Sequence, residues 1–170
     1  MLQVRDAAVD DTEAIVSATA TGWRTAYRGI VTDERLAELP VDRWRREIGE
    51  GLRRPVADAF TRVAEVDGAF AGYCYVAAPP REAEDAPGDA ELVALYVDPE
   101  HRGQGAGSAL MRTALTRLAE LGYERVFLWT FAENDRTIAF YERHGWSRDG
   151  AEKVHPRAQA VAVRLQRAVP

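Results

Sequence analysis

The residues whose types and spacing could do chemistry lie in a glycine-rich turn in the middle of the chain. Gly103, Gly105 and Gly107 occur within five residues, with Arg102 before them and Ser108 after them. Glycines let the backbone approach a ligand closely and point successive N–H groups the same way. Arg102 adds a fixed positive charge with a planar set of hydrogen-bond donors. This combination predicts a cradle for a phosphate group.

The stretches on either side of the turn predict a strand and a helix that hold the cradle in place. Residues 91–97 are almost continuously apolar, which suits a strand covered on both faces, and Pro99 prevents its continuation. Apolar residues then recur at helical spacing from Leu110 to Leu121, and Gly122 occupies a position where helices commonly end. A helix that begins at the turn adds unpaired amides and the positive end of its dipole to the cradle.

Two common nucleotide-binding motifs do not fit the turn. The dinucleotide fingerprint G-x-G-x-x-G needs a third glycine where Ser108 stands, and the P-loop needs a lysine, which the turn lacks. The remaining pattern is R-x-x-G-x-G, carried by Arg102, Gly105 and Gly107. With it the sequence resembles the GNAT superfamily of acetyl-CoA-dependent N-acetyltransferases, whose central motif [QR]-x-x-G-x-[GA] links a strand to a long helix. The alternative is a tight turn that uses glycine only for its backbone freedom.

A second motif supports the resemblance and runs from Asn134 to Trp146. Members of the superfamily commonly carry N-x-x-[AT]-x-x-[FL]-Y-E-[RK]-x-G-F after their fifth strand, and this stretch matches it with Trp146 at the usual phenylalanine. Asn134 is a favoured residue for the start of a helix, and Gly145 for its end. The resemblance extends over the whole chain; it is strongest over residues 91–146 and weak before Phe60.

The expected fold is α/β. Strands are expected near Leu2 and Val4 and at residues 60–65, 69–78, 91–97, 125–131, 147–155 and 160–165. Helices are expected from Asp10, which has capping-box spacing with Glu13, from Thr32 or Asp33 to Leu39, around Trp44, Ile48 and Leu52, after the glycine turn, and from Asn134. The resemblance implies a mixed, mostly antiparallel sheet of six to seven strands, splayed between strands four and five and flanked by helices on both faces, with coenzyme A in the wedge.

The resemblance also implies the chemistry and the residues that contact the cofactor. The reaction is direct transfer of the acetyl group of acetyl-CoA to a primary amine of a small molecule, without a covalent enzyme intermediate. A main-chain amide of Tyr96 or Val97 would stabilise the thioester oxygen as it gains charge. The implied cofactor-binding residues are Leu95, Tyr96, Val97, Arg102, Gly103, Gln104, Gly105, Ala106, Gly107, Ser108, Asn134 and Tyr141. Asn134 could instead serve only as a helix cap.

Two side chains are candidates for proton transfer. An alkyl amine of pKa ~10.4 is neutral only about once in 10³ at pH 7, so a group must accept its proton. Glu91 stands where some members of the superfamily place a catalytic glutamate, and the edge of an apolar strand could raise its pKa; the alternative is a solvated acid at a strand end. Tyr141 matches the family tyrosine that supplies a proton to the departing thiolate. Its alternative is a half-buried helix aromatic.

The acceptor side of the site has no recognisable signature. Trp23 and Tyr27 could line an acceptor pocket together with Glu91, or they could simply pack against each other four residues apart on a helix. Residues 77–89 are expected to form a solvent loop. Acetylation of a protein N-terminus or lysine, and a non-catalytic module that binds acyl-CoA, are the alternative functions.

Composition limits the class of protein. The chain has 170 residues, 46% hydrophobic and 29% charged, which suits a single domain over residues 1–170. A net charge of −5 argues against a nucleic-acid partner and agrees with a cationic acceptor. No stretch suits a membrane span or a signal peptide, so a cytoplasmic location without a membrane partner is expected. His101, His144 and His155 lack metal-site spacing, Cys74 is expected to be a core thiol, and a homodimer remains open.

Overall fold

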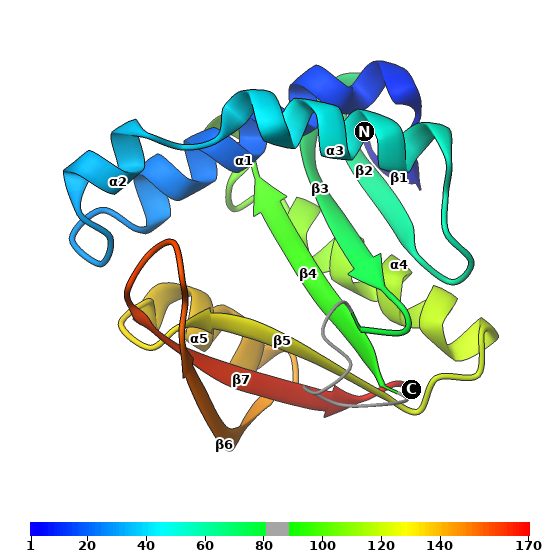
Figure 1. Ribbon diagram of the computed structural model, residues 1–170. Coiled ribbons are helices and arrows are strands. Elements are labelled where there is room, and N and C mark those ends of the chain that lie inside the picture. The colour runs from blue at the N-terminus through cyan, green and yellow to red at the C-terminus, as the bar shows by residue number, and fades with distance from the viewer. Residues whose placement is uncertain (81–88) are drawn as a thin grey trace.

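The computed structural model describes residues 1–80 and 89–170, and its centre is a seven-stranded sheet of order β1-β2-β3-β4-β5-β7-β6 (Figure 1). All neighbouring strands are antiparallel except β4 and β5, which are parallel. This confirms the expected fold class. The strands are β1 (Leu2–Asp6), β2 (Phe60–Val66), β3 (Ala69–Ala77), β4 (Ala90–Val97), β5 (Arg125–Phe131), β6 (Ser147–Val154) and β7 (Val161–Ala168).

Helices cover both faces of the sheet. They are α1 (Thr12–Ala26), α2 (Asp33–Ala37), α3 (Val41–Arg53), α4 (Ala106–Glu120) and α5 (Asp135–Arg143), with short 3₁₀ turns η1 (Val9–Asp11) and η2 (Pro99–His101). Helices α4 and α5 lie behind the strands in Figure 1 and share one apolar core with them, whereas α1 and α3 pack on the opposite face of β2 and β3. Within residues 1–80 and 89–170, no helix combines the length and apolar character needed to cross a membrane.

The sheet splays between β4 and β5, as expected. These strands pair only at Ala90–Val126 and Glu91–Phe127, close to where β4 begins, and they diverge toward the other end (Figure 1). Among the residues that the structure describes, the edge of β4 that faces β5 therefore has no strand partner beyond Glu91. An extended ligand could bind to such an edge as an additional strand would.

A β-bulge in β4 decides which side chains face which helices. Tyr75 of β3 pairs with Ala94 and Val76 pairs with Leu92, so Val93 has no opposite residue. Because an extra residue shifts the two-residue alternation, Leu92 packs into the α4 core whereas Ala94 packs on the α1 side. After the bulge, Ala94 and Tyr96 therefore face α1 and α3, whereas Leu95 and Val97 face the α4 core.

Two expectations about local structure had different outcomes. Thr32 caps α2 through its Oγ1 atom, which accepts a hydrogen bond from the Arg35 amide at 3.5 Å. The expected capping box at Asp10 is wrong, because η1 occupies this position and α1 begins at Thr12. Asp11 stabilises that turn instead by accepting from the Ala8 amide and pairing with Arg5. Most of the expected loop over residues 77–89 lies outside the described residues.

Gly22, in the middle of α1, allows that helix to contact Tyr96 of β4. A Cβ atom on Gly22 would lie 2.6 Å from Cε1 of Tyr96 and closer still to Cδ1. The ring cannot move away freely, because it stacks on Tyr73 with centroids 5.8 Å apart. The absence of a side chain at Gly22 is therefore required by packing.

Gly22→Ala is expected to lower the free energy of unfolding by up to about 2 kcal/mol in urea denaturation. Alanine favours a helix by about 1 kcal/mol over glycine, but forced overpacking costs about 1–3 kcal/mol. Gly51→Ala in α3 is the control, because its Cβ would meet no atom within 4 Å and should give a small stabilisation. Equal stabilisation by both substitutions would show that the contact with Tyr96 is not tight.

Candidate active site

The glycine turn forms an unpaired set of amides at the start of α4. Gly103 and Gly105 have φ angles of 79° and 86°, which only glycine adopts readily. In the described part of the chain, no acceptor receives a hydrogen bond from the amides of Gly103, Gly105, Ala106, Gly107 or Ser108. Converging free amides at the positive end of a helix dipole suit a phosphate group.

Gly107 brings this cradle close to β4 and α5. A Cβ atom there would lie 3.3 Å from Cζ of Phe140 and 3.4 Å from Cγ2 of Val97. The third glycine of the turn therefore serves close packing rather than backbone conformation, since its φ angle is not positive. This packing places the cradle next to the end of β4, where the wedge is open.

The side chains of Arg102 and Ser108 have partners that the sequence does not reveal. Nη2 of Arg102 donates to Oγ1 of Thr25 at the end of α1, at 3.2 Å. The Ser108 hydroxyl lies 2.9 Å from Nε2 of His144, whose Nδ1 lies 2.7 Å from the Phe140 carbonyl oxygen. Because that carbonyl only accepts, neutral His144 carries its proton on Nδ1 and accepts the Ser108 proton at Nε2. Analysis of the sequence missed this pair.

Tyr141 and Asn134 both lie on the segment that follows β5. Tyr141 is 6% exposed and packs edge-on against Trp146 with centroids 5.5 Å apart. Burial raises the pKa of the Tyr141 phenol well above its usual range, so the hydroxyl stays protonated. Oδ1 of Asn134 accepts from the Thr137 amide at 3.4 Å, which confirms its role as a helix cap.

Glu91 is buried. It is 4% exposed and lies in the short paired part of β4, between Ala77 of β3 and Phe127 of β5. The alternative of a solvated acid at a strand end is therefore wrong. Glu91 is not among the residues that line a cavity on the side of the sheet covered by α1 and α3. That cavity reaches β4 at Val93, Ala94 and Tyr96.

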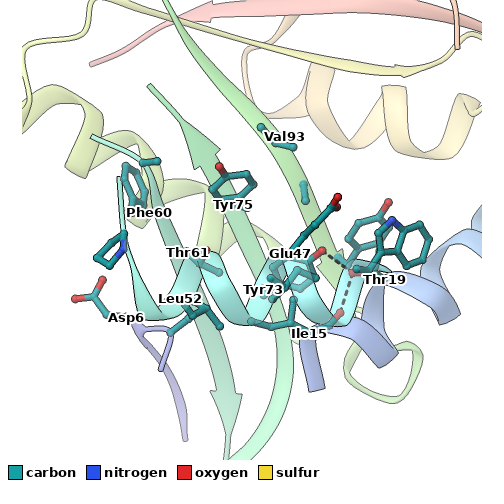
Figure 2. Close-up of a pocket in the computed structure, with 18 of the residues that line it drawn as sticks. Asp6, Ile15, Thr19, Glu47, Leu52, Phe60, Thr61, Tyr73, Tyr75 and Val93 are labelled. Carbon is teal, nitrogen blue, oxygen red and sulfur yellow. Dashed lines mark hydrogen bonds between the residues drawn. The ribbon is translucent and has the colours of Figure 1, made fainter. Parts of the chain in front are cut away.

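A cavity of about 690 Å³ lies on the face of β3 and β4 that α1 and α3 cover (Figure 2). A volume in this range is typical of small-molecule sites. Figure 2 shows Asp6 and Phe60 at one end and Thr19 at the other. The lining residues are Asp6, Ala7, Ile15, Thr19, Trp23, Trp44, Glu47, Ile48, Gly51, Leu52, Pro55, Ala59, Phe60, Thr61, Tyr73, Tyr75, Val93, Ala94, Tyr96, His155 and Arg157.

Trp23 and Tyr27 pack against each other, and one of them also lines the cavity. The two rings pack edge-on with centroids 5.0 Å apart, as expected for residues four apart. Trp23 also lines the cavity, whereas Tyr27 lies outside its lining and packs against Phe131 at 4.6 Å. Burial raises the pKa of Tyr27, and a hydrogen bond with Tyr96 partly offsets this rise.

The surroundings of two further groups, His155 and Cys74, are defined by hydrogen bonding and burial. Nδ1 of His155 accepts from the Ala158 amide at 3.1 Å, so neutral His155 carries its proton on Nε2. Burial raises the pKa of the Cys74 thiol to about 12, which confirms an unreactive core thiol rather than a nucleophile.

Comparison with known proteins agrees with this geometry. A sequence model described as the acetyltransferase (GNAT) family matches residues 21–146. The chain belongs to the GNAT family. As a fold, this GNAT protein is similar to the PaiA N-acetyltransferase from Thermoplasma acidophilum, solved in complex with coenzyme A. The TM-score is 0.80 at 17% identity, with 99% of each chain covered.

Curated relatives of this GNAT protein include two kinds of acetyltransferase. The mycothiol acetyltransferase of Sanguibacter keddieii is 40% identical over 86 residues, which are 51% of this chain and 27% of that protein. The chain thus spans about a quarter of the length of the mycothiol acetyltransferases that it matches. The uncharacterised N-acetyltransferase YuaI of Bacillus subtilis is 28% identical over 148 residues, covering 85% of this chain and 79% of YuaI.

Proposed function

We propose that this GNAT protein transfers the acetyl group of acetyl-CoA directly to a primary amine of a small molecule. The observation that carries the proposal is the set of amides of Gly103, Gly105, Ala106, Gly107 and Ser108, which have no acceptor among the described residues and open beside the wedge between β4 and β5. A cavity of small-molecule size lies on the neighbouring face of β4. The strand therefore separates a cradle suited to a diphosphate from a chamber suited to an acceptor.

The chain's own groups fit the demands of the cofactor. The free amides and the helix dipole would bind the diphosphate, because both favour negative charge at this point. Main-chain groups of Leu95, Tyr96 and Val97 lie on the part of β4 that does not pair with β5, where they could hold the pantetheine arm. A main-chain amide of Tyr96 or Val97 would stabilise charge on the thioester oxygen.

Proton transfer in the proposed reaction uses Glu91 and Tyr141. The amine nitrogen forms a bond to the acetyl carbon, and the carbon–sulfur bond breaks. Glu91 accepts the amine proton through water, since its carboxylate lies outside the cavity lining. Tyr141, protonated because burial raises its pKa, supplies a proton or a hydrogen bond to the departing thiolate.

A screen of amines with acetyl-CoA tests the proposed function, with free thiol as the readout and calorimetry of coenzyme A binding in parallel. We expect saturable coenzyme A binding and thiol release that depends on a small amine. Binding without thiol release for any amine or peptide would indicate a non-catalytic module. Thiol release with peptides alone would indicate a protein acetyltransferase.

Glu91→Gln is expected to lower kcat/KM by about 10²-fold or more and to remove the acidic limb of the pH–rate profile. Glutamine keeps the shape of the buried side chain but cannot take the amine proton. Glu124→Gln, an exposed acid between α4 and β5, is the control and should change neither quantity. An acidic limb that survives in Glu91→Gln would assign the base to another group.

A further inference from the structure

We propose that the acceptor is a primary amine on a flat, apolar body, of the arylalkylamine kind. This inference rests on the proposed function and concerns the cavity between α1, α3 and the sheet. The aromatic walls of the cavity, its pair of bonded hydroxyl groups and its paired acidic groups each favour such an acceptor over sugar amines and polyamines.

Aromatic rings dominate the cavity walls. Trp23 of α1 and Trp44 of α3 lie with centroids 6.0 Å apart, and Tyr73 and Tyr96 form a stacked pair on the sheet. Phe60 and Tyr75 enclose the other end (Figure 2). Rings from helices and strands therefore face one chamber, which favours a ligand that stacks on π-faces.

Two of the hydroxyl groups that line the cavity, those of Thr19 and Tyr73, bond to each other. Oγ1 of Thr19 donates to the Ile15 carbonyl at 2.8 Å and lies 2.7 Å from the Tyr73 hydroxyl (Figure 2). Since Thr19 gives its proton to Ile15, Tyr73 donates to Thr19, and both hydroxyl protons are used. A polyhydroxylated acceptor would lose hydrogen bonds to water here, at a cost of about tenfold in affinity for each uncompensated hydroxyl.

The acidic residues of the lining lie at the rim and are paired. The side chains of Asp6 and Glu47 are 77% and 55% exposed, and they pair with Arg62 at 2.9 Å and Arg43 at 2.6 Å. Such carboxylates can attract an amine toward the entrance. They do not offer the free, desolvated carboxylate that a second cationic centre, as in a polyamine, would need.

The test compares acceptors of matched size. Phenethylamine and tryptamine represent the proposed class, and spermidine, glucosamine and an alanine-headed tripeptide represent the others. We expect kcat/KM for the aromatic amines to exceed that for each of the others by about tenfold or more. A higher value for spermidine, glucosamine or the tripeptide would overturn the inference while leaving acetyl transfer intact. Absence of thiol release with every amine would overturn both.

Trp44→Ala tests whether the aromatic wall selects the acceptor. We expect about a tenfold higher KM for phenethylamine, with an unchanged KM for acetyl-CoA and for n-butylamine, because only the aromatic body contacts that wall. Trp44→Phe should restore most of the affinity. Arg46→Ala, exposed on the same helix and outside the cavity lining, is the matched control and should change none of these values.

A melting curve and the acetyl-CoA dissociation constant show whether the Trp44→Ala protein is folded. If the Trp44→Ala protein is unstable, the milder Trp44→Phe variant is measured in its place. We expect it to raise the KM for phenethylamine by less than Trp44→Ala would. If a folded Trp44 variant shows the same rise in KM for phenethylamine and for n-butylamine, the ring supports the fold and does not select the acceptor.

Discussion

Replacing Tyr141 by phenylalanine is expected to lower kcat by about 10²-fold or more while the dissociation constant of acetyl-CoA changes by less than about twofold. The substitution removes one hydroxyl and keeps the ring that packs on Trp146. Burial raises the pKa of Tyr141, which favours the neutral form, so the donor is present throughout the usual pH range. Steady-state thiol release and calorimetry measure the two quantities.

Tyr123→Phe provides the matched control for this substitution. Tyr123 lies just beyond the far end of α4 and is half-buried, so loss of its hydroxyl should leave kcat unchanged. If Tyr141→Phe also has an unchanged kcat, Tyr141 has no part in the chemical step. If instead acetyl-CoA affinity falls with kcat, Tyr141 acts mainly in binding.

Gly105→Val is expected to raise the dissociation constant of coenzyme A by about 10²-fold or more. Gly105 has a φ angle of 86°, where a side chain costs about 1–2 kcal/mol and a β-branched one costs more. Relief of this strain would rotate the peptide planes of the turn and redirect the amides of Gly105 and Ala106. At about 1.5–3 kcal/mol for each lost bond to a charged group, two lost bonds account for the effect.

Gly122→Val separates backbone strain from cofactor binding. Gly122 follows the other end of α4 with a φ angle of 83°, and its Cβ would meet no atom within 4 Å. Both variants should therefore lose similar stability in urea denaturation, but only Gly105→Val should lose coenzyme A affinity. Equal coenzyme A affinity in the two variants would contradict a phosphate site at the turn.

The fold could be predicted from the sequence because its strongest signals are local. The apolar run before Pro99, the glycine turn and the helical periodicity that follows predict β4, the cradle and α4 with almost correct bounds. The Asn134 cap likewise fixes the start of α5. Each of these signals lies within a few residues of the element that it determines, so no knowledge of tertiary contacts is needed.

The acceptor chamber could not be predicted, because its walls meet only after folding. Trp44 and Leu52 are readily predicted to share a helix face, but nothing in their spacing indicates that this face covers Tyr73 and Tyr75. No pattern in the sequence indicates the bulge at Val93, yet this bulge places Ala94 on the side of the sheet that faces α1. Residues from separate elements thus form one cavity through tertiary packing alone.

Partners that are distant in the sequence also explain why single residues differ from what the sequence predicts. The sequence was equally consistent with a solvated Glu91 at a strand end, but β4 lies between β3 and β5 there and the residue is buried. The bond between Ser108 and His144 joins residues 36 apart in the chain. The packing of α4 against α5, with Gly107 next to Phe140, brings these two residues together.

The brief contact between β4 and β5 has a consequence for how the protein unfolds. With only two residue pairs joining them, the two portions of the sheet share little hydrogen bonding, so the apolar core to which both contribute carries most of the coupling between them. Acetyl-CoA bound along the gap would contact both portions of the sheet, so that they would unfold more cooperatively. Saturating coenzyme A at 100 times its dissociation constant would add about 2.7 kcal/mol to that shared transition.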